Sequence, residues 1–370
     1  MKLVAERQAL YAALQHVGSV ITSTIASPIF QNVKMEATKD SVFLSATDLE
    51  VGLRIKVKGV EVKEKGCVLI PEFRISPILR ATLDDTVSIE GDEGAITLRS
   101  EDGRFRVVAE DPADFADIPE LSDDSAVEVD PEVFQYMVQR TAFATADERG
   151  RYALNGVLVL VDEQGTFEMV AADGARLAEV KKKASNPKKH TIDCIVMKKG
   201  IEQASRLAGL SGEPLRIQAT ERQFLVENDV GRMCCQLVEG QFPNYREVVP
   251  RDCKIKVELP VKALLNALQR AASLTSEQTK AVDFSFSKGL LVLSSEAPDL
   301  GEAEVRLPIE YDDEDVQISF NPEFVQDVLQ VVERESIKVE FEGSCSPAVF
   351  RSGVDYQYVV SPVVREEGEV

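Results

Sequence analysis

The chain has little of what metal enzymes and secreted proteins depend on. It contains only two histidines, His16 and His190, which lie far apart in the sequence. Its six cysteines form no C-x-x-C pair and show no regular spacing, which predicts reduced thiols in a cytoplasmic protein. No apolar run approaches the roughly 18 residues that a membrane helix needs, and residues 1–7 do not resemble a signal peptide. The sequence therefore favours a soluble protein without a metal or a cofactor.

The short motifs of catalysis are absent as well. The sequence contains no G-x-S-x-G, Walker A or H-E-x-x-H motif and no glycine-rich phosphate loop. The acidic run Asp312–Asp315 lacks the pattern of a calcium loop and is typical of a solvated turn. A hydrolase or metal enzyme is the competing class, but these absences favour a protein without catalysis.

A helix-like cassette occurs three times, at 7–20, 131–144 and 261–274. Each copy places one apolar residue four positions before another, followed by glutamine and a basic or imidazole side chain. The copies are Leu10…Leu14-Gln15-His16, Phe134…Val138-Gln139-Arg140 and Leu264…Leu268-Gln269-Arg270. Their offsets, 124 and 130 residues, are too long for a solenoid repeat. They predict three similar domains in series, at 1–121, 126–250 and 254–370.

Each predicted domain holds a second helix-like stretch, at 72–82, 198–210 and 322–333, with strand-like sequence between the helices. Asn321 and Pro322 are typical of a helix cap followed by proline at the first helical position. Pro77, in contrast, predicts that the helix within 72–82 begins only at Ser76. Residues 87–91 and 96–100 predict a hairpin. Two short helices on antiparallel sheets in each repeat indicate an α+β fold class.

The charge distribution is uneven. The formal net charge is −21, from 63 acidic and 42 basic residues, which argues against a nucleic-acid partner because phosphates repel carboxylates. The six helix-like stretches together nevertheless carry a net charge of +3. One interpretation is a molecule with one face that tolerates phosphate. The other is a chance distribution of charge between helices and strands, and charge alone does not choose between them.

An ordered set of motifs runs from residue 1 to about residue 365. Its members are Ala46–Glu50, Leu154–Val157, Ala171–Ala178, Glu239–Tyr245, Asp299–Glu304, Phe320–Phe324 and Tyr358–Pro362. Together they closely resemble the bacterial sliding clamps, the β subunits of DNA polymerase III. The resemblance implies a head-to-tail homodimeric ring around double-stranded DNA, with the helices on its inner wall and the sheets outside. It also implies contacts to phosphates that carry no sequence information.

The resemblance implies three sets of site residues. The inner-wall candidates are Arg80, Arg140, Lys198, Lys199, Arg206 and Arg270, with Lys280 on a following loop. The sequence departs from the family pattern at Ser23–Ala26 and at Phe73, two places where basic residues are usual. The alternative to an inner wall is that its candidate lysines and arginines are ordinary solvated residues.

The second set forms a groove for short linear peptides of the replicative polymerase, the clamp loader and repair proteins. Its positions are Arg151, Leu154, Ala172, Gly174, Ala175, Arg176, Leu177, Pro243, Val248, Val359, Val360, Ser361, Pro362, Val363, Val364 and Arg365. Ala172 and Ala175 replace the family's threonine and histidine, and Ser361 and Val363 replace methionines, which implies a smoother pocket. The alternative is that the apolar members belong to the core at a domain junction.

The third set closes the dimer, with Phe105 of the first domain facing Ser273 and Leu274 of the third. Arg104 and Arg106 are expected to pair with the acidic Glu302–Glu304 region, each exposed pair contributing about 0–1 kcal/mol. Ser273 stands where a larger aliphatic residue is usual, which indicates a weaker interface. The implied location is the cytoplasm, on the nucleoid. The remaining alternative is a clamp paralogue or peptide-binding scaffold with a reduced role on DNA.

Overall fold

A computed structural model of the chain describes residues 1–21, 27–92, 94–122, 125–147, 153–251, 253–276 and 280–364. The chain forms two compact units. Unit 1 comprises Met1–Gln135, Ala184–Ile192 and Lys199–Leu237, and unit 2 comprises Tyr136–Lys183, Asp193–Lys198 and Val238–Val370. The boundary between the units runs through the central repeat. Within the described ranges, no helix is both long and apolar enough to span a membrane.

Two α-helices of each repeat lie where the sequence predicts them, among the residues that the structure describes. They are α1 (Arg7–Gly18) and α2 (Glu72–Ala81), α3 (Pro131–Thr141) and α4 (Lys198–Ala208), and α5 (Val261–Ala272) and α6 (Pro322–Val331). Short 3-10 turns are η1 (Pro28–Gln31), η2 (Pro112–Asp114), η3 (Ala142–Ala144) and η4 (Tyr245–Glu247). The threefold repeat is therefore present in the secondary structure.

The ends and faces of the helices follow from their residues. Asn321 caps α6, because its side chain accepts a backbone N–H two residues on at 3.0 Å, and Pro322 occupies the first helical turn. In α5, Leu264 and Leu268 are fully buried, whereas Arg270 on the opposite face is exposed. This one-sided burial is the result that the apolar stripe of the cassette predicts.

The prediction that α2 begins only at Ser76 was wrong, since α2 starts at Glu72 and contains Pro77 in its interior. Proline has no N–H, so the helix lacks the usual bond to the carbonyl four residues earlier. The fully buried Ile75 and Leu79 lie on either side of the proline. Their packing holds the helix together across the missing bond.

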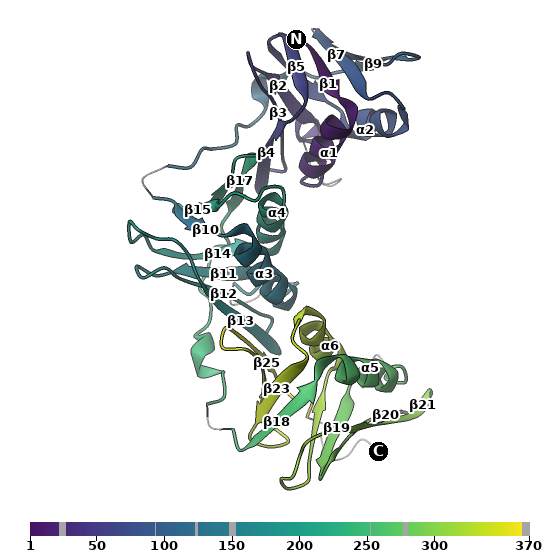
Figure 1. Ribbon diagram of the computed structural model, residues 1–370, viewed down its shortest axis with the longest axis vertical. Helices are drawn as coiled ribbons and strands as arrows, with labels where there is room; N and C mark the ends of the chain where they lie inside the picture. The colour runs from purple at the N-terminus through teal and green to yellow at the C-terminus, as the bar shows by residue number, and fades with distance from the viewer. Residues whose placement is uncertain are drawn as a thin grey trace. The chain divides into compact units, whose positions relative to one another are not determined.

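Among its described residues, unit 1 contains two antiparallel sheets (Figure 1). The larger has the strand order β10-β15-β16-β17-β4-β3-β2-β6 and the smaller β5-β1-β7-β8-β9. In the larger sheet the strands are β10 (Val127–Val129), β15 (Leu215–Ala219), β16 (Gln223–Glu227), β17 (Gly231–Gln236), β4 (Val51–Val57), β3 (Val42–Thr47), β2 (Val33–Ala37) and β6 (Gly66–Ile70). In the smaller they are β5 (Val60–Glu64), β1 (Lys2–Glu6), β7 (Thr86–Asp92), β8 (Ala95–Arg99) and β9 (Arg104–Val108). The pairing of β7 with β8 confirms the predicted hairpin.

The described part of unit 2 also contains two antiparallel sheets, ordered β14-β11-β12-β13-β25-β24-β23-β18 and β21-β20-β19-β22. The larger is built from β14 (Ile192–Met197), β11 (Gly156–Val161), β12 (Thr166–Ala172), β13 (Arg176–Lys183), β25 (Tyr356–Val360), β24 (Ala348–Ser352), β23 (Ser336–Phe341) and β18 (Ile255–Pro260). The smaller is built from β21 (Gly301–Pro308), β20 (Leu290–Ala297), β19 (Val282–Ser287) and β22 (Val316–Phe320). The expected α+β fold class is therefore confirmed.

One pairing rule builds both eight-stranded sheets. β17, the last strand of the second repeat, pairs with β4 of the first, and β25, the last strand of the third repeat, pairs with β13 of the second. β4 and β13 occupy the same place in their repeats. The strands left over by this rule, β9 of the first repeat and β21 of the third, each lie at the edge of a sheet in the described chain.

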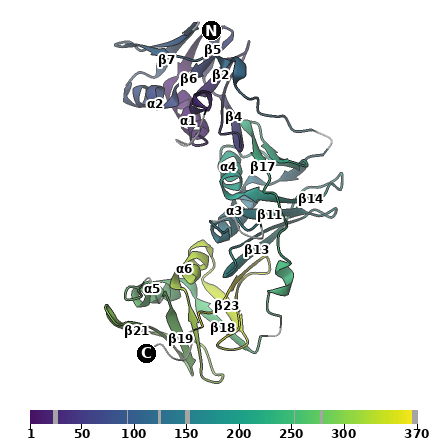
Figure 2. The same cartoon turned by 180° about the vertical axis from the view of Figure 1, so that it is seen from behind.

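The helices of each unit cover one face of its sheets (Figures 1 and 2). α1 lies beside α2 and packs on β2, β3 and β4, and α5 lies beside α6 and packs on β19, β20 and β21. The apolar sides of these helices form the core together with the sheets. Their polar sides are left on the outer face of the helix layer, which is where the expected inner-wall residues must be sought.

Candidate functional site

The expected inner-wall cations of unit 1 fall into two groups. Arg80 on α2 and Arg206 on α4 are exposed. Lys199, at the start of α4, is instead half-buried and is already engaged, because its ammonium group donates to the Val20 carbonyl at 2.8 Å and pairs with the Asp48 carboxylate. Of the expected cations of unit 1, Arg80 and Arg206 are therefore the exposed ones, and Lys199 joins α4 to the β3–β4 hairpin.

A histidine of the cassette lies close to one of these cations. Burial and the nearby Arg206 guanidinium lower the pKa of His16 on α1. The imidazole is therefore neutral at pH 7 and adds no charge to the helix face. Ser19, one turn further on, donates to the Gln203 side chain at 3.2 Å, so that α1 and α4 are joined by hydrogen bonds between neutral groups.

In unit 2, Arg270 on α5 and Lys280 are exposed, and Lys198 is half-buried. Arg140 does not fit the expectation of a solvent-facing cation. Its side chain is only 4% exposed and pairs with Glu333 at 3.3 Å, while its guanidinium lies 3.5 Å from the ring centroid of Tyr136. Arg140 therefore joins α3 to the segment after α6, and no open surface presents it to a phosphate.

Four of the apolar residues expected in the peptide groove come together. Leu154, Ala172, Leu177 and Val359 belong to one cluster of unit 2 that is built from β11, β12, β13 and β25. Ala172, Leu177 and Val359 are almost fully buried, whereas Leu154 is half-buried against them. These four residues thus belong largely to the core, as the alternative interpretation expected, and the peptide groove stays a prediction.

Two chain segments carry further residues of the expected groove. After β25 the chain continues along the cluster, where the Ser361 N–H donates to the Ala175 carbonyl and the Val363 N–H to the Ser319 carbonyl, each at 2.8 Å. Val364 is 63% exposed, and Pro362 is half-buried. On the second segment, Pro243 is half-buried and Val248 exposed. Val360, in contrast, is fully buried and has no surface to offer a ligand.

The turn between β12 and β13 carries Gly174, which has a φ of +99° and is exposed. An L side chain is strained in this conformation, so glycine is required there. The Asp173 carboxylate accepts the N–H groups of Ala175 and Arg176, both at 2.9 Å, and so closes the turn. The equivalent turn of the first repeat is closed by Asp48 in the same way.

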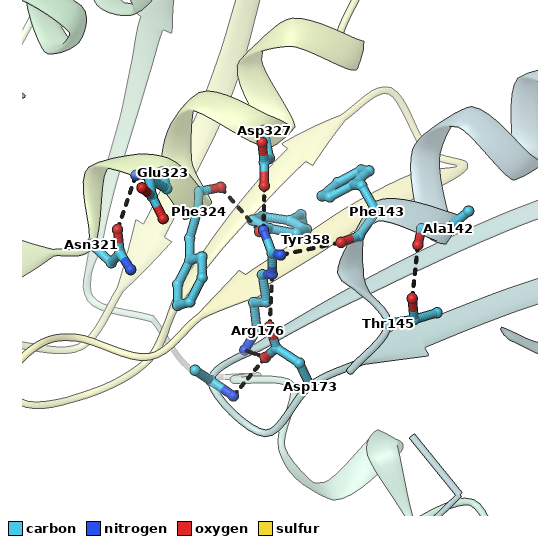
Figure 3. Close-up of polar contacts among 11 residues, drawn as sticks. Ala142, Phe143, Thr145, Asp173, Arg176, Asn321, Glu323, Phe324, Asp327 and Tyr358 are labelled. Carbon is cyan, nitrogen blue, oxygen red and sulfur yellow. Dashed lines mark hydrogen bonds and ion pairs between the residues drawn. The ribbon is translucent and has the colours of Figure 1, made fainter. Parts of the chain in front are cut away.

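Arg176, one of the residues expected in the groove, is largely enclosed by other groups of unit 2 (Figure 3). Its side chain is 12% exposed. The guanidinium bonds to Asp173 at 2.9 Å, pairs with Asp327 of α6, and donates to the carbonyl of Phe143 in η3 at 3.1 Å. It also lies 4.4 Å from the ring centroid of Phe324. The side chain therefore fastens α6 and η3 to the turn between β12 and β13.

A pair of buried carboxylates lies next to the apolar cluster that contains Leu154, Ala172, Leu177 and Val359. Glu168 on β12 and Glu179 on β13 are 5% and 3% exposed, and Lys181 pairs with both. Burial and the neighbouring Glu179 raise the pKa of Glu168. Burial by itself would raise the pKa of Glu179 too. Hydrogen bonds to groups that include Lys181 outweigh burial, so the pKa of Glu179 is lowered overall. The hydroxyl of Tyr245, a member of the apolar cluster, donates to Glu168, so the two carboxylates are joined to that cluster.

Several cluster members were missing from the expected set. Tyr245 is buried in the apolar cluster, and Phe242 and Val249 are packed against that cluster. The only signal in the sequence was the aromatic residues flanking Pro243, which also suit an ordinary linker. Arg151, Arg365 and Ser23–Ala26 lie outside the described residues.

The expected dimer residues lie on the surface. Phe105 on β9 is 37% exposed, and it lines a hollow of about 330 Å³ together with Ile78 and Thr82 at the end of α2. Ser273, directly after α5, is exposed and Leu274 is half-buried. In the described part of the chain, no group of three or more histidine, cysteine or acidic side chains is placed to hold a metal ion.

Comparison with known proteins gives one consistent result. Family models described as the N-terminal, central and C-terminal domains of the DNA polymerase III beta subunit match residues 1–120, 128–244 and 246–363. The beta sliding clamp of Chlamydia muridarum is 29% identical, with 98% of this chain and 99% of that protein covered. A sliding clamp (DNA polymerase III subunit beta) from Pseudomonas aeruginosa bound to griselimycin is 28% identical, with a TM-score of 0.93 over 99% of this chain and 100% of that one. A sliding clamp from Bacillus subtilis shares the fold at 23% identity, with a TM-score of 0.93 over the same shares.

Proposed function

The chain belongs to the DNA polymerase III β-subunit family, the bacterial sliding clamps, and on this premise we propose which of its surfaces meet DNA, partner peptides and a second copy. The protein is a sliding clamp, a processivity factor that encircles duplex DNA as a dimer and tethers polymerase through peptides. We infer that it has no catalysis of its own and acts in the cytoplasm on the nucleoid, and that its domains span 1–121, 126–250 and 254–370.

The pairing rule of the sheets carries the proposal for ring closure. The rule joins the last strand of a repeat to β4, β13 or the equivalent strand of the repeat before it. Within one chain it leaves β9 and β21 as edge strands. Pairing β9 of one copy with β21 of the other satisfies the rule at the remaining junctions and leaves neither strand exposed. Because β9 and β21 belong to different ends of the chain, the contact is head-to-tail and closes with two copies.

Side chains at the two edges suit this pairing. β9 carries Arg104 and Arg106, both exposed, and β21 carries Glu302 and Glu304, also exposed, so opposite charges meet across the junction. The hollow beside Phe105 is a suitable receptor for Leu274 of the second copy. Apolar packing in that hollow stabilises the interface, while exposed ion pairs add only about 0–1 kcal/mol each.

Sedimentation tests this closure directly. The expected mass at micromolar protein is about twice the 40.7 kDa of one chain. Charge reversal of Arg104 and Arg106 together is expected to raise the dimer dissociation constant, and reversal of Glu302 and Glu304 in the same chain is expected to restore it. A mass of one chain at every concentration would contradict the proposal.

The inner wall is proposed to consist of the polar faces of the helices, with Arg80, Arg206 and Arg270 as its free cations and Lys198, Lys199 and Lys280 at its margins. Such sparse contacts hold phosphates without fixing a register, because they carry no sequence information. Replacing Arg206 and Arg270 with alanine is expected to reduce the salt dependence of DNA binding by about two counterions. An unchanged salt slope would remove both from the wall.

The groove of unit 2 is proposed to bind extended partner peptides. The half-buried Leu154 gives an apolar floor, and the exposed Val364 and Val248 give walls, which suits a peptide with aliphatic or aromatic anchors. The probe is griselimycin, the ligand of the Pseudomonas aeruginosa clamp. Leu154→Asp is expected to abolish its binding, whereas Val354→Ala, a change at a fully exposed site elsewhere in unit 2, is expected to leave it intact. Undiminished binding to the Leu154 variant would contradict the assignment.

A further inference from the structure

A second hollow, of about 450 Å³, lies on the helix face of unit 1, between α1 and α2. Tyr11 and Gln15 of α1 form one side, and Phe73, Pro77 and Arg80 of α2 form the other. The three α2 residues are spaced at i, i+4 and i+7, so they form one stripe along the helix. The hollow therefore combines two aromatic rings and a guanidinium on a surface that is otherwise polar.

Phe73 is the unusual member of this stripe. Its side chain is 62% exposed, although a phenylalanine on a helix normally turns into the core. The guanidinium of Arg74 lies 5.2 Å from the centroid of its ring, and Arg80 is exposed about two turns further along the helix from Phe73. An exposed aromatic ring thus lies on a helix that also carries two arginines.

The polar groups of the hollow complete the pattern. Pro77, inside α2, has no N–H and so donates no helical bond to the Phe73 carbonyl. Glu72 is the one acidic residue there, and its carboxylate already accepts from Ser76 at 2.5 Å and Gln15 at 3.4 Å. Arg80 and Glu72 are the charged residues that line the hollow, and Arg74 adds a second cation beside Phe73.

We propose that this hollow binds an unpaired nucleotide of single-stranded DNA. The base stacks on Phe73, and the flanking phosphates meet Arg74 and Arg80. Aromatic platforms flanked by cations are the usual means of holding single strands without sequence preference. In a duplex both faces of each base are already stacked, so Phe73 gains nothing from paired DNA and the site favours single strands.

This inference deepens the proposed function, because it rests on the helix face being the one that meets DNA. It assigns to that face a site that retains the protein at the boundary between duplex and single-stranded DNA. Duplex passes the hollow held only by phosphate contacts, whereas an unpaired base is retained at Phe73.

The test uses the full-length protein and a fluorescein-labelled oligothymidylate of about 20 nucleotides, with a blunt duplex of equal length as the second probe. Phe73→Ala is expected to weaken single-strand binding about 5- to 150-fold, the range for losing one stacked base, and to change duplex binding less than twofold. Phe73→Tyr is expected to restore single-strand binding. Val354→Ala, at a fully exposed apolar site of unit 2, is the matched control and is expected to change neither affinity.

A 2-aminopurine placed in the oligonucleotide reports the stacking itself. Its fluorescence is expected to be quenched by the unaltered protein and by Phe73→Tyr but not by Phe73→Ala. Equal single-strand affinity for the Phe73→Ala variant, or an equal loss for duplex and single strand, would overturn the inference. Retention of the Phe73→Ala variant on circular duplex measures the proposed function separately, so a failure of encirclement is distinguished from a failure of this site.

Discussion

Replacing Arg176 separates a structural role from a binding role. In Arg176→Met the side chain keeps much of its volume but loses the bonds to Asp173, Asp327 and the Phe143 carbonyl. Removing one partner of a buried ion pair costs about 3–5 kcal/mol, because the other charge stays buried without compensation. Asp327 is 36% exposed, and water recovers part of this cost, so we expect a loss of about 3 kcal/mol.

The assay is thermal unfolding of unit 2 together with griselimycin titration at 20 °C. For a cooperative unit of roughly 150–250 residues, 1 kcal/mol shifts Tm by about 2–4 °C, so the expected decrease is about 6–12 °C. Griselimycin affinity below the transition is expected to change less than threefold. Arg334→Met, at an exposed arginine of the same unit, is expected to leave Tm within about 1 °C. An unchanged Tm with lost griselimycin binding would refute the reasoning, because it would show that Arg176 acts in peptide binding and not in stability.

Three further outcomes follow from single contacts. Phe105→Asp is expected to convert the dimer into a single chain of 40.7 kDa in sedimentation, because it places a carboxylate in the hollow proposed for apolar packing; a persistent dimer would exclude Phe105 from the interface. Gly52→Ala places a methyl group 2.4 Å from the Ile118 side chain and is expected to destabilise unit 1 by about 1–3 kcal/mol in urea unfolding, so equal stability would show that the segment around Ile118 is free to move. Burial raises the pKa of the Cys194 thiol to about 12, so iodoacetamide at pH 8 is expected to modify the exposed Cys345 at least a hundredfold faster, and equal rates would contradict this burial.

The sequence predicted the helices well because their evidence is local. The cassette spacing and the Asn321-Pro322 cap depend on residues within one or two turns. The prediction from Pro77 was wrong for the complementary reason. The helix α2 continues through the proline because Ile75 and Leu79 are buried, and that burial depends on the sheet beneath the helix. Local patterns thus decide where a helix exists, and tertiary packing decides whether a single break interrupts it.

The charged residues were less predictable because their partners are distant in the chain. Arg176 meets Asp327 across 151 residues, and Arg140 meets Glu333 across nearly two hundred. Nothing beside either arginine indicates that it is buried, so both resembled surface cations. Among the cations that do reach solvent are Arg80 and Arg206, which lie on helix faces whose apolar partners could be identified from periodicity.

Retention on DNA circles tests the central claim most directly. The protein is loaded on nicked circular DNA by the clamp loader of the same organism, washed at high salt and then followed after the circle is linearised. The account predicts that the protein remains on the circle and leaves by the free ends once the DNA is cut. Equal retention on circular and linear DNA would contradict it, because binding would then depend on contacts and not on encirclement.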